Sequence, residues 1–304
     1  VKPNFMPQEA ITPFFAGKPV SSIMRNRVAW PVYQVRLERQ SKRGNDMPTI
    51  DAAGCKINIE IDGAASAPPL VMSNSLGTNL HMWDEQAKAL AKRFRIIRYD
   101  QRGHGKSGAP KGTYTVDQLG RDVLAILDHL EIKKTNFLGL SMGGTTGMWL
   151  ACNAPHRFQK LALANTGARI ATRDIWNARI MTVLDKGMNS LVDATIDRWF
   201  SKKFRDTKSP VIDKVREMLL TTSKYGYAGC SAAIRDADFR WAIGGVKLPT
   251  LVIVGSLDPA TPPEAGEFVA QRIPRAKLVS LEAAHLSNLE QSGQFTRAVE
   301  DFFS

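Results

Sequence analysis

The chain of 304 residues contains only three cysteines, Cys55, Cys152 and Cys230, and they stand far apart. Three cysteines cannot all pair in disulfides, and no Cys-x-x-Cys or mixed Cys/His spacing suggests a metal site. We therefore expect three free thiols in a reducing compartment, and neither a disulfide framework nor a bound metal.

The sequence also lacks any long apolar run. A membrane-spanning helix needs about 20 consecutive apolar residues, and a secretory signal needs a charged start followed by an apolar core. Neither pattern occurs in the chain. These absences predict a cytoplasmic protein without a membrane partner. The composition, 43% hydrophobic and 23% charged, is typical of a globular protein.

Acidic residues are few relative to basic ones, 29 against 41, and the formal net charge is +12. A basic chain sometimes binds nucleic acid. Here the basic residues are scattered, and no basic stripe is interleaved with aromatic residues. The pattern favours a solvated basic surface, without a nucleic-acid partner, whose positive field attracts a small anionic substrate. Nothing in the sequence sets the oligomeric state.

Residues 1–46 differ in pattern from the rest of the chain. They show no sustained helical or strand periodicity, and five prolines interrupt them. From Met47 the pattern becomes regular. We expect Met47 to be the natural start of the protein, and residues 1–46 to be an upstream extension that is largely disordered.

Beyond Met47, short apolar runs alternate with helical patterns, which predicts a mostly parallel sheet with helices on both faces. The predicted strands span residues 56–61, 70–73, 95–100, 136–140, 160–164, 250–254 and 277–281. The clearest helix, 116–130, begins with the capping-box pair Thr115 and Gln118. Another helix carries Phe295, Val299 and Phe302 at core spacing.

The alternation of strand and helix breaks between residues 166 and 247. Segments 174–185 and 211–222 are predicted helices, and no convincing strand appears there. We predict a helical cap at 166–247, inserted into a core made of residues 47–165 and 248–304.

The segment 136–144 (NFLGLSMGG) places Ser141 in a G-x-S-x-G motif between an apolar strand and a helix. That context predicts a nucleophile elbow, in which a strained turn exposes the serine hydroxyl. Bulky residues two positions either side of the serine would clash, so Gly139 and Gly143 fit the motif. The strand–elbow–helix pattern and the inserted cap together predict the α/β-hydrolase fold. That fold implies an eight-stranded sheet, of which seven strands are located above.

A nucleophilic serine needs a base and an orienting acid, which follow it in this fold in the order Asp or Glu, then His. Of five histidines, only His156 and His285 follow Ser141. His156 lies past the helix that Ser141 begins, whereas His285 follows a predicted strand at the edge where such sites form. Asp258 is the one aspartate that follows a buried strand after Ser141. We predict Ser141, Asp258 and His285 as the catalytic triad.

Acyl chemistry on serine also needs donors for a developing oxyanion. We expect the N–H of Met142 to be one donor. The loop after the strand at 70–73 should supply the second. We assign the N–H of Leu76, with Ser75 as the alternative.

Several strings resemble the bacterial 3-oxoadipate enol-lactonases of aromatic-acid degradation. They are SNSLGT at 73–78, LHMWD at 80–84, YDQRGHGKS at 99–107, GLSMGG at 139–144, IWNARI at 175–180, AAIRDAD at 232–238 and AHLSNLEQ at 284–291. The resemblance runs from Met47 onward. The string at 99–107 is shared by many α/β-hydrolases, whereas the cap strings and 284–291 are the most specific. The basic extension 1–46 is a departure from the family.

This resemblance implies hydrolysis of an anionic five-membered lactone, 3-oxoadipate enol-lactone, through an acyl-enzyme and without a metal or organic cofactor. The substrate keeps a carboxylate, so a cation or a hydrogen-bond donor is expected in the pocket. Arg169 and Arg173 are the candidates, although a surface or salt-bridging arginine is the alternative for each. Ser75, Trp149 and Trp176 are further candidate substrate contacts, with core or cap packing as the alternative for the tryptophans.

Other functions remain open. Another serine hydrolase of the fold is one alternative: a carboxylesterase, a hydrolase of carbon–carbon bonds in ring-cleavage products, or a perhydrolase. A non-catalytic ligand receptor on the same fold is another, since fold does not dictate function. Dehalogenases and epoxide hydrolases are disfavoured, because they carry Asp where this chain carries Ser141.

Overall fold

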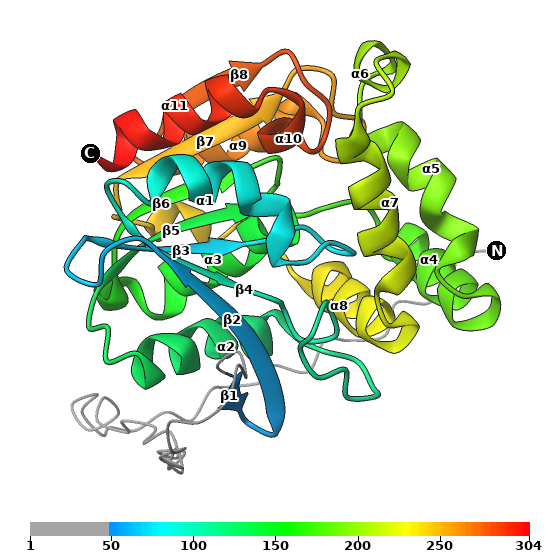
Figure 1. Cartoon of the computed structure of the whole chain (residues 1–304), viewed down its shortest axis with the longest axis horizontal. Helices are drawn as coiled ribbons and strands as arrows, with labels where there is room; N and C mark the ends of the chain where they lie inside the picture. The colour runs from blue at the N-terminus through cyan, green and yellow to red at the C-terminus, as the bar shows by residue number, and fades with distance from the viewer. Residues whose placement is uncertain (1–48) are drawn as a thin grey trace, which may run out of the picture. The chain divides into compact units, whose positions relative to one another are not determined.

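The computed structural model describes residues 49–304, so the predicted start at Met47 and the extension 1–46 lie outside the described residues. Residues 49–304 belong to one compact unit. Their eight strands form one sheet in the order β1-β2-β4-β3-β5-β6-β7-β8 (Figure 1). The strands are β1 (Thr49–Ala52), β2 (Cys55–Asp62), β3 (Pro69–Ser73), β4 (Arg95–Tyr99), β5 (Thr135–Leu140), β6 (Phe158–Ala164), β7 (Thr250–Gly255) and β8 (Lys277–Leu281).

The sheet is mostly parallel, as predicted. β2 pairs antiparallel with β1 and with β4, and every pairing from β4 to β8 is parallel. The seven predicted strands are confirmed within one or two residues at each end. β1 was not predicted from the sequence, because it is a four-residue edge strand that pairs only with β2.

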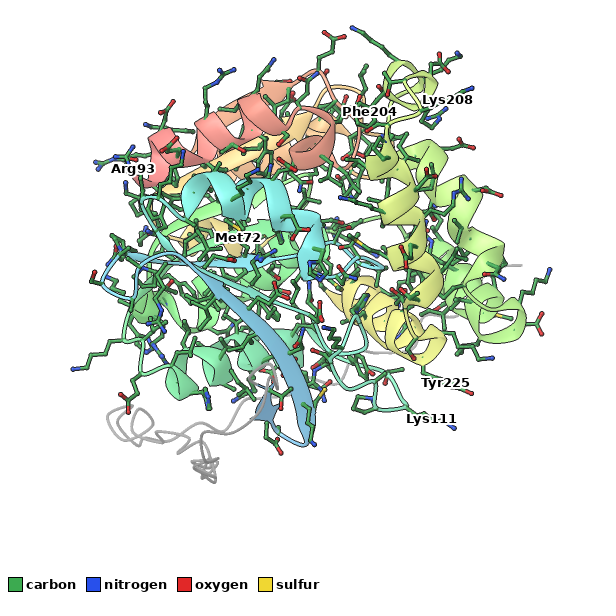
Figure 2. All side chains as sticks on the ribbon, viewed as in Figure 1. Met72, Arg93, Lys111, Phe204, Lys208 and Tyr225 are labelled. Atoms are coloured by element: carbon green, nitrogen blue, oxygen red, sulfur yellow. The ribbon has the colours of Figure 1, made fainter. Side chains whose placement is uncertain are left out.

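Helices cover both faces of the sheet, and alternate strand residues serve the two sides. Val71 and Phe137 pack with α2 (Val116–His129), α3 (Met142–Asn153) and α9 (Pro263–Arg272). Met72 and Leu138 pack with α1 (Asp84–Leu90) and α11 (Ser292–Phe303) on the other side. Met72 lies in the middle of the sheet (Figure 2), where it is fully buried. Because both faces are covered, β5 and β7 are buried at every position.

The predicted helix ends agree with the structure. Thr115 accepts the N–H of Gln118, whose side chain accepts the N–H of Thr115 in return, so the capping box at α2 is confirmed. In α11, Phe295 and Val299 are fully buried and Phe302 is nearly so, as the spacing predicted. Short helices complete the core: η1 (Leu80–Trp83), η2 (Pro155–Arg157), η3 (Ile243–Gly245) and α10 (Ser287–Glu290). The three cysteines are free thiols, as predicted.

Five helices occupy the chain between β6 and the short helix η3. They are α4 (Arg173–Lys186), α5 (Asn189–Trp199), α6 (Lys202–Asp206), α7 (Pro210–Thr221) and α8 (Lys224–Asp236). Two of them, α4 and α7, match the predicted helices, while α5, α6 and α8 were missed. The exact division at residues 166 and 247 stays a prediction.

The helices from α4 to α8 are fixed to the rest of the molecule by apolar and cationic contacts. Trp176, Ile196 and Leu219 belong to the same hydrophobic cluster as Met72 on the sheet. At the lower right of Figure 2, the Lys111 ammonium lies 4.9 Å from the ring centre of Tyr225 at the start of α8. None of the helices in residues 49–304 is long and apolar enough to cross a membrane.

Candidate active site

Ser141 occupies the turn between β5 and α3, at a backbone conformation that side chains rarely adopt. Its φ is +57° and its ψ is −112°. Two hydrogen bonds hold the turn: the Ser141 N–H donates to the carbonyl of Ala164 at 2.9 Å, and the Thr166 hydroxyl donates to the Ser141 carbonyl at 2.9 Å. The strained turn predicted for the G-x-S-x-G motif is therefore present.

Glycine is required on both sides of this turn. A Cβ at Gly139 would lie 2.2 Å from the carbonyl oxygen of Gly143, and one at Gly143 would lie 2.0 Å from the carbonyl oxygen of Ser73. Both obstacles are backbone atoms of buried elements, which have no room to move. The close packing of α3 against β3 and β5 sets the position of Ser141 at the end of the sheet.

His285 and Asp258 come from the loops that follow β8 and β7, and they meet at the same sheet edge as Ser141. His285 Nδ1 lies 2.8 Å from Oδ2 of Asp258, and both residues are buried. Ser141 and His285 line one cavity of about 240 Å³. Within residues 49–304 no hydrogen bond joins the Ser141 hydroxyl to His285; such bonds often tighten only when substrate is bound.

The surroundings of Asp258 keep it ionised. Burial alone would raise the pKa of this carboxyl, but His285 and the hydrogen bonds from His285, Thr261 and Asn165 outweigh it, so the pKa lies below its usual value of 3.8. The Thr261 hydroxyl donates at 2.7 Å, the Asn165 amide at 3.0 Å and the Ala260 N–H at 2.8 Å. An ionised Asp258 is suited to orient His285 and to stabilise its protonated form.

Trp199, the last residue of α5, covers the face of His285. The two ring centres are 5.9 Å apart and the planes differ by 30°. The N–H of Leu286 donates to the carbonyl of Trp199 at 3.1 Å, so the end of α5 is bonded directly to the His285 loop. His285 is therefore enclosed by α5 on one side and by the sheet edge on the other.

The two predicted oxyanion donors have no acceptor among the residues that the structure describes. Met142 is the first residue of α3, where the N–H has no partner within the helix. Leu76 is buried and lines the cavity together with Ser75. The structure thus brings Leu76 to the cavity that Ser141 lines, with Met142 adjacent in sequence, as an oxyanion hole requires.

The loop that carries Leu76 is fixed by a hydrogen bond to His104. The N–H of Gly77 donates to His104 Nε2 at 2.9 Å, and Nδ1 lies 3.1 Å from the carbonyl of Arg102. Burial lowers the pKa of His104 to about 4, so its imidazole is neutral near neutral pH. A neutral ring with its proton on Nδ1 satisfies both contacts at once.

The structure separates the predicted substrate contacts. Trp176 lines the cavity, and its indole N–H donates to the carbonyl of Ile170 at 2.7 Å. Trp149 does not reach the cavity, because its ring packs in the core against Gly120 of α2. The prediction of Trp149 as a substrate contact is therefore wrong, and the packing alternative holds.

The two arginines predicted as carboxylate ligands also lie elsewhere. Arg169 is 3.8 Å from Asp238, and Arg173 is 2.8 Å from Asp236, both as partly exposed ion pairs. Neither residue lines the cavity that contains Ser141. The surface ion-pair alternative describes them correctly.

Two other arginines, Arg179 on α4 and Arg198 on α5, do line the cavity. Burial lowers the pKa of Arg198, and repulsion from Arg179 lowers it further. Asp197, which precedes Arg198 in the sequence, forms an ion pair with Arg205 instead, at 3.2 Å. In the described part of the chain, no ion pair joins Arg179 or Arg198 to a carboxylate. Arg179 falls within the family-like string IWNARI at 175–180, the only sequence signal that pointed to either residue.

Residues 68–229 match the family described as alpha/beta hydrolase fold. The chain is 41% identical over 252 residues to 3-oxoadipate enol-lactonase 2 of Acinetobacter baylyi, which covers 83% of this chain and 94% of that protein.

Two solved structures are similar to this one. The enol-lactonase of Burkholderia xenovorans is 44% identical with a TM-score of 0.83, covering 84% of this chain and 99% of that one. A hydrolase from Pseudomonas aeruginosa is 42% identical with a TM-score of 0.84, covering 86% and 100%. The chain therefore belongs to the α/β-hydrolase family of enzymes and, within it, to the group of the 3-oxoadipate enol-lactonases.

Proposed function

We propose that this enzyme hydrolyses 3-oxoadipate enol-lactone to 3-oxoadipate, a step in the breakdown of aromatic compounds by way of protocatechuate or catechol. Its relatives include 3-oxoadipate enol-lactonases, and the chemistry of the cavity suits the same substrate. The substrate is a small lactone that carries a carboxylate. It therefore needs a nucleophile for the lactone carbonyl and a cationic group for the anion.

Arg179 and Arg198 line the same cavity as Ser141 and His285, and this placement is the main support for the proposed substrate. Two cations held near each other, with no carboxylate partner in the described residues, repel each other and favour an anionic ligand. A substrate carboxylate placed between them would relieve the repulsion and form charge-assisted hydrogen bonds. The cavity volume of about 240 Å³ suits a small molecule.

In the proposed first half-reaction, Ser141 Oγ attacks the lactone carbonyl while His285 takes the hydroxyl proton. Asp258 holds the imidazole by the 2.8 Å hydrogen bond to Nδ1. The N–H groups of Leu76 and Met142 receive the oxyanion. When the ring C–O bond breaks, the enol oxygen leaves with the proton from His285 and the enol becomes the ketone.

The second half-reaction releases the acyl group from Ser141. A water molecule attacks the acyl carbonyl and gives its proton to His285, which then protonates Ser141 Oγ as the ester bond breaks. The product is 3-oxoadipate, and the free enzyme is restored. His285 takes and returns the transferred proton in both half-reactions.

The proposal is tested by following freshly generated 3-oxoadipate enol-lactone by ultraviolet absorbance, with p-nitrophenyl acetate as a neutral comparison ester. We expect rapid loss of the lactone with the native chain and only background loss with Ser141→Ala. Activity on the ester without activity on the lactone would reject the substrate and leave a general carboxylesterase. Inactivity on both would favour a non-catalytic receptor.

A further inference from the structure

The carboxylate of Glu290, at the end of α10, joins two parts of the chain that border the active site. Its Oε2 accepts the N–H of Ala284 at 3.1 Å and the N–H of Ser201 at 3.1 Å. Its Oε1 accepts the hydroxyl of Ser201. Ala284 immediately precedes His285, and Ser201 lies between α5 and α6, so one side chain bonds the histidine loop to the helices above it.

The acceptor capacity of Glu290 is used by neutral donors. In residues 49–304 no ion pair joins Glu290 to a cation, whereas the nearby Glu282 lies 3.8 Å from Lys203. An ionised carboxylate only accepts hydrogen bonds, and such bonds from backbone N–H groups are stronger than neutral ones. Glu290 therefore fixes the backbone at Ser201 and Ala284 and is not part of an ion pair.

A second connection lies on the other side of the base. The N–H of Leu286 donates to the carbonyl of Trp199, and the Trp199 ring covers His285. His285 is thus flanked in sequence by two residues, Ala284 and Leu286, that are both tied to the end of α5 and the segment after it. The same helix end carries Arg198, which lines the cavity.

Ser201 is itself fixed in place, which makes the link rigid. Its hydroxyl accepts the N–H of Phe204 as the N-cap of α6. Phe204, labelled in Figure 2, stacks on Phe200 with ring centres 5.3 Å apart. The position of Glu290 relative to α5 therefore depends on packed elements and not on a free loop.

We propose that Glu290 is a positioning residue for the hydrolytic reaction. It holds the His285 imidazole and the Arg198 guanidinium in a fixed relation, so that a substrate whose carboxylate is bound by Arg198 presents its carbonyl to the base. This inference rests on the proposed function for the identity of the anion, but the positioning of His285 applies to any ester substrate.

The test uses the full chain and four variants. Glu290→Gln keeps the shape but turns an amide toward backbone donors, and Ser201→Ala removes one of the three links. Ser201→Thr restores the hydroxyl, and Glu282→Gln is the matched control, since it removes the same charge from an exposed residue in the loop between β8 and α10. The turnover number and KM are measured on p-nitrophenyl acetate and on the enol-lactone, per active site titrated with a serine-reactive phosphonate, alongside thermal unfolding.

We expect Glu290→Gln to lower kcat per titrated site about tenfold or more on both substrates, because small misplacements of a base are costly. KM should rise for the lactone and stay constant for the neutral ester. Ser201→Ala should show a smaller fall that Ser201→Thr reverses, and it decides the question if Glu290→Gln does not fold.

Two results would overturn the inference. An unchanged kcat per titrated site with only a lower unfolding temperature would reduce Glu290 to a stabilising residue. An equal fall with Glu282→Gln would show that charge near the site matters and position does not. A native enzyme that is active on the ester alone would reject the proposed substrate, while the comparison of variants on the ester would still decide the role of Glu290.

Discussion

The N–H of Gly77, one residue after the proposed oxyanion donor Leu76, donates to His104 Nε2 at 2.9 Å. His104 is buried, and its other ring nitrogen lies 3.1 Å from the Arg102 carbonyl. The shape of the loop that carries Leu76 thus depends on a neutral imidazole. A protonated ring would have a second donor where the Gly77 N–H needs an acceptor.

This dependence predicts a loss of stability in mild acid. Burial lowers the pKa of His104 from 6.5 to about 4, so between these values the unfolded chain binds a proton that the native protein does not. The contribution of the neutral His104 to the free energy of unfolding is fully present above pH 6.5. It is lost as the pH falls toward 4, and the loss is roughly 3 kcal/mol. Urea unfolding of the native chain and of His104→Gln across this range measures it. Equal pH slopes for the two proteins would contradict the prediction.

The cavity arginines predict a specific loss of anion recognition. Arg198→Ala should raise KM for the enol-lactone tenfold to roughly a hundredfold, because a charge-assisted hydrogen bond is lost. KM for p-nitrophenyl acetate should not change. Arg169→Ala is the control, since Arg169 pairs with Asp238 outside the cavity and its loss should leave both constants unchanged. A larger effect at Arg169 than at Arg198 would reverse the assignment.

The hydrogen bonds of Asn165 predict that activity depends on this residue, which contacts the proposed triad. Its amide donates to Asp258 at 3.0 Å and to the carbonyl of Ala284 at 3.2 Å. Asn165→Asp keeps the size but replaces a donor with a second carboxylate, so kcat should fall at least about tenfold. Asn153→Asp, at the end of α3, should leave kcat unchanged. Full activity in Asn165→Asp would remove Asn165 from the site.

Two helix glycines predict opposite effects of the same substitution. A Cβ at Gly120 would lie 2.0 Å from the Trp149 ring, whereas a Cβ at Gly293 would meet nothing within 4 Å. Gly293→Ala should therefore stabilise α11, by about 0.5 kcal/mol, by reducing the freedom of the unfolded chain. Gly120→Ala should destabilise by about 1 kcal/mol or more through overpacking. Thermal unfolding of both variants checks the pair, and a shift of the same sign in both would contradict it.

The sheet and the three proposed triad residues were accessible to sequence reasoning for a physical reason. Parallel strands covered on both faces leave long apolar runs, and their carboxyl ends meet at one edge. Residues that come directly after strands, such as Ser141, Asp258 and His285, are therefore brought together by the topology alone. The edge strand β1 has no such signal, because four residues with one partner are too short to show a pattern.

The residues that line the cavity were only partly accessible in the same way: Ser75 and Trp176 were predicted, and the two arginines were not. Arg179 and Arg198 approach each other only because α4 and α5 pack over the sheet edge, and no spacing in the sequence encodes that crossing. Trp149 was misassigned because α3 is buried almost all round, so its sequence does not reveal which face meets α2 and which meets the cavity. Helix packing decides both cases, and it depends on tertiary shape.

We propose that Ser141 carries the acyl group during lactone hydrolysis. Rapid quenching of the native enzyme with the enol-lactone, followed by peptide mass spectrometry, tests this most directly. We predict a transient adduct of the ring-opened acyl group on the peptide that contains Ser141, and neither adduct nor turnover in Ser141→Ala. Turnover of the lactone by Ser141→Ala, or an adduct on a different peptide, would contradict this role of Ser141.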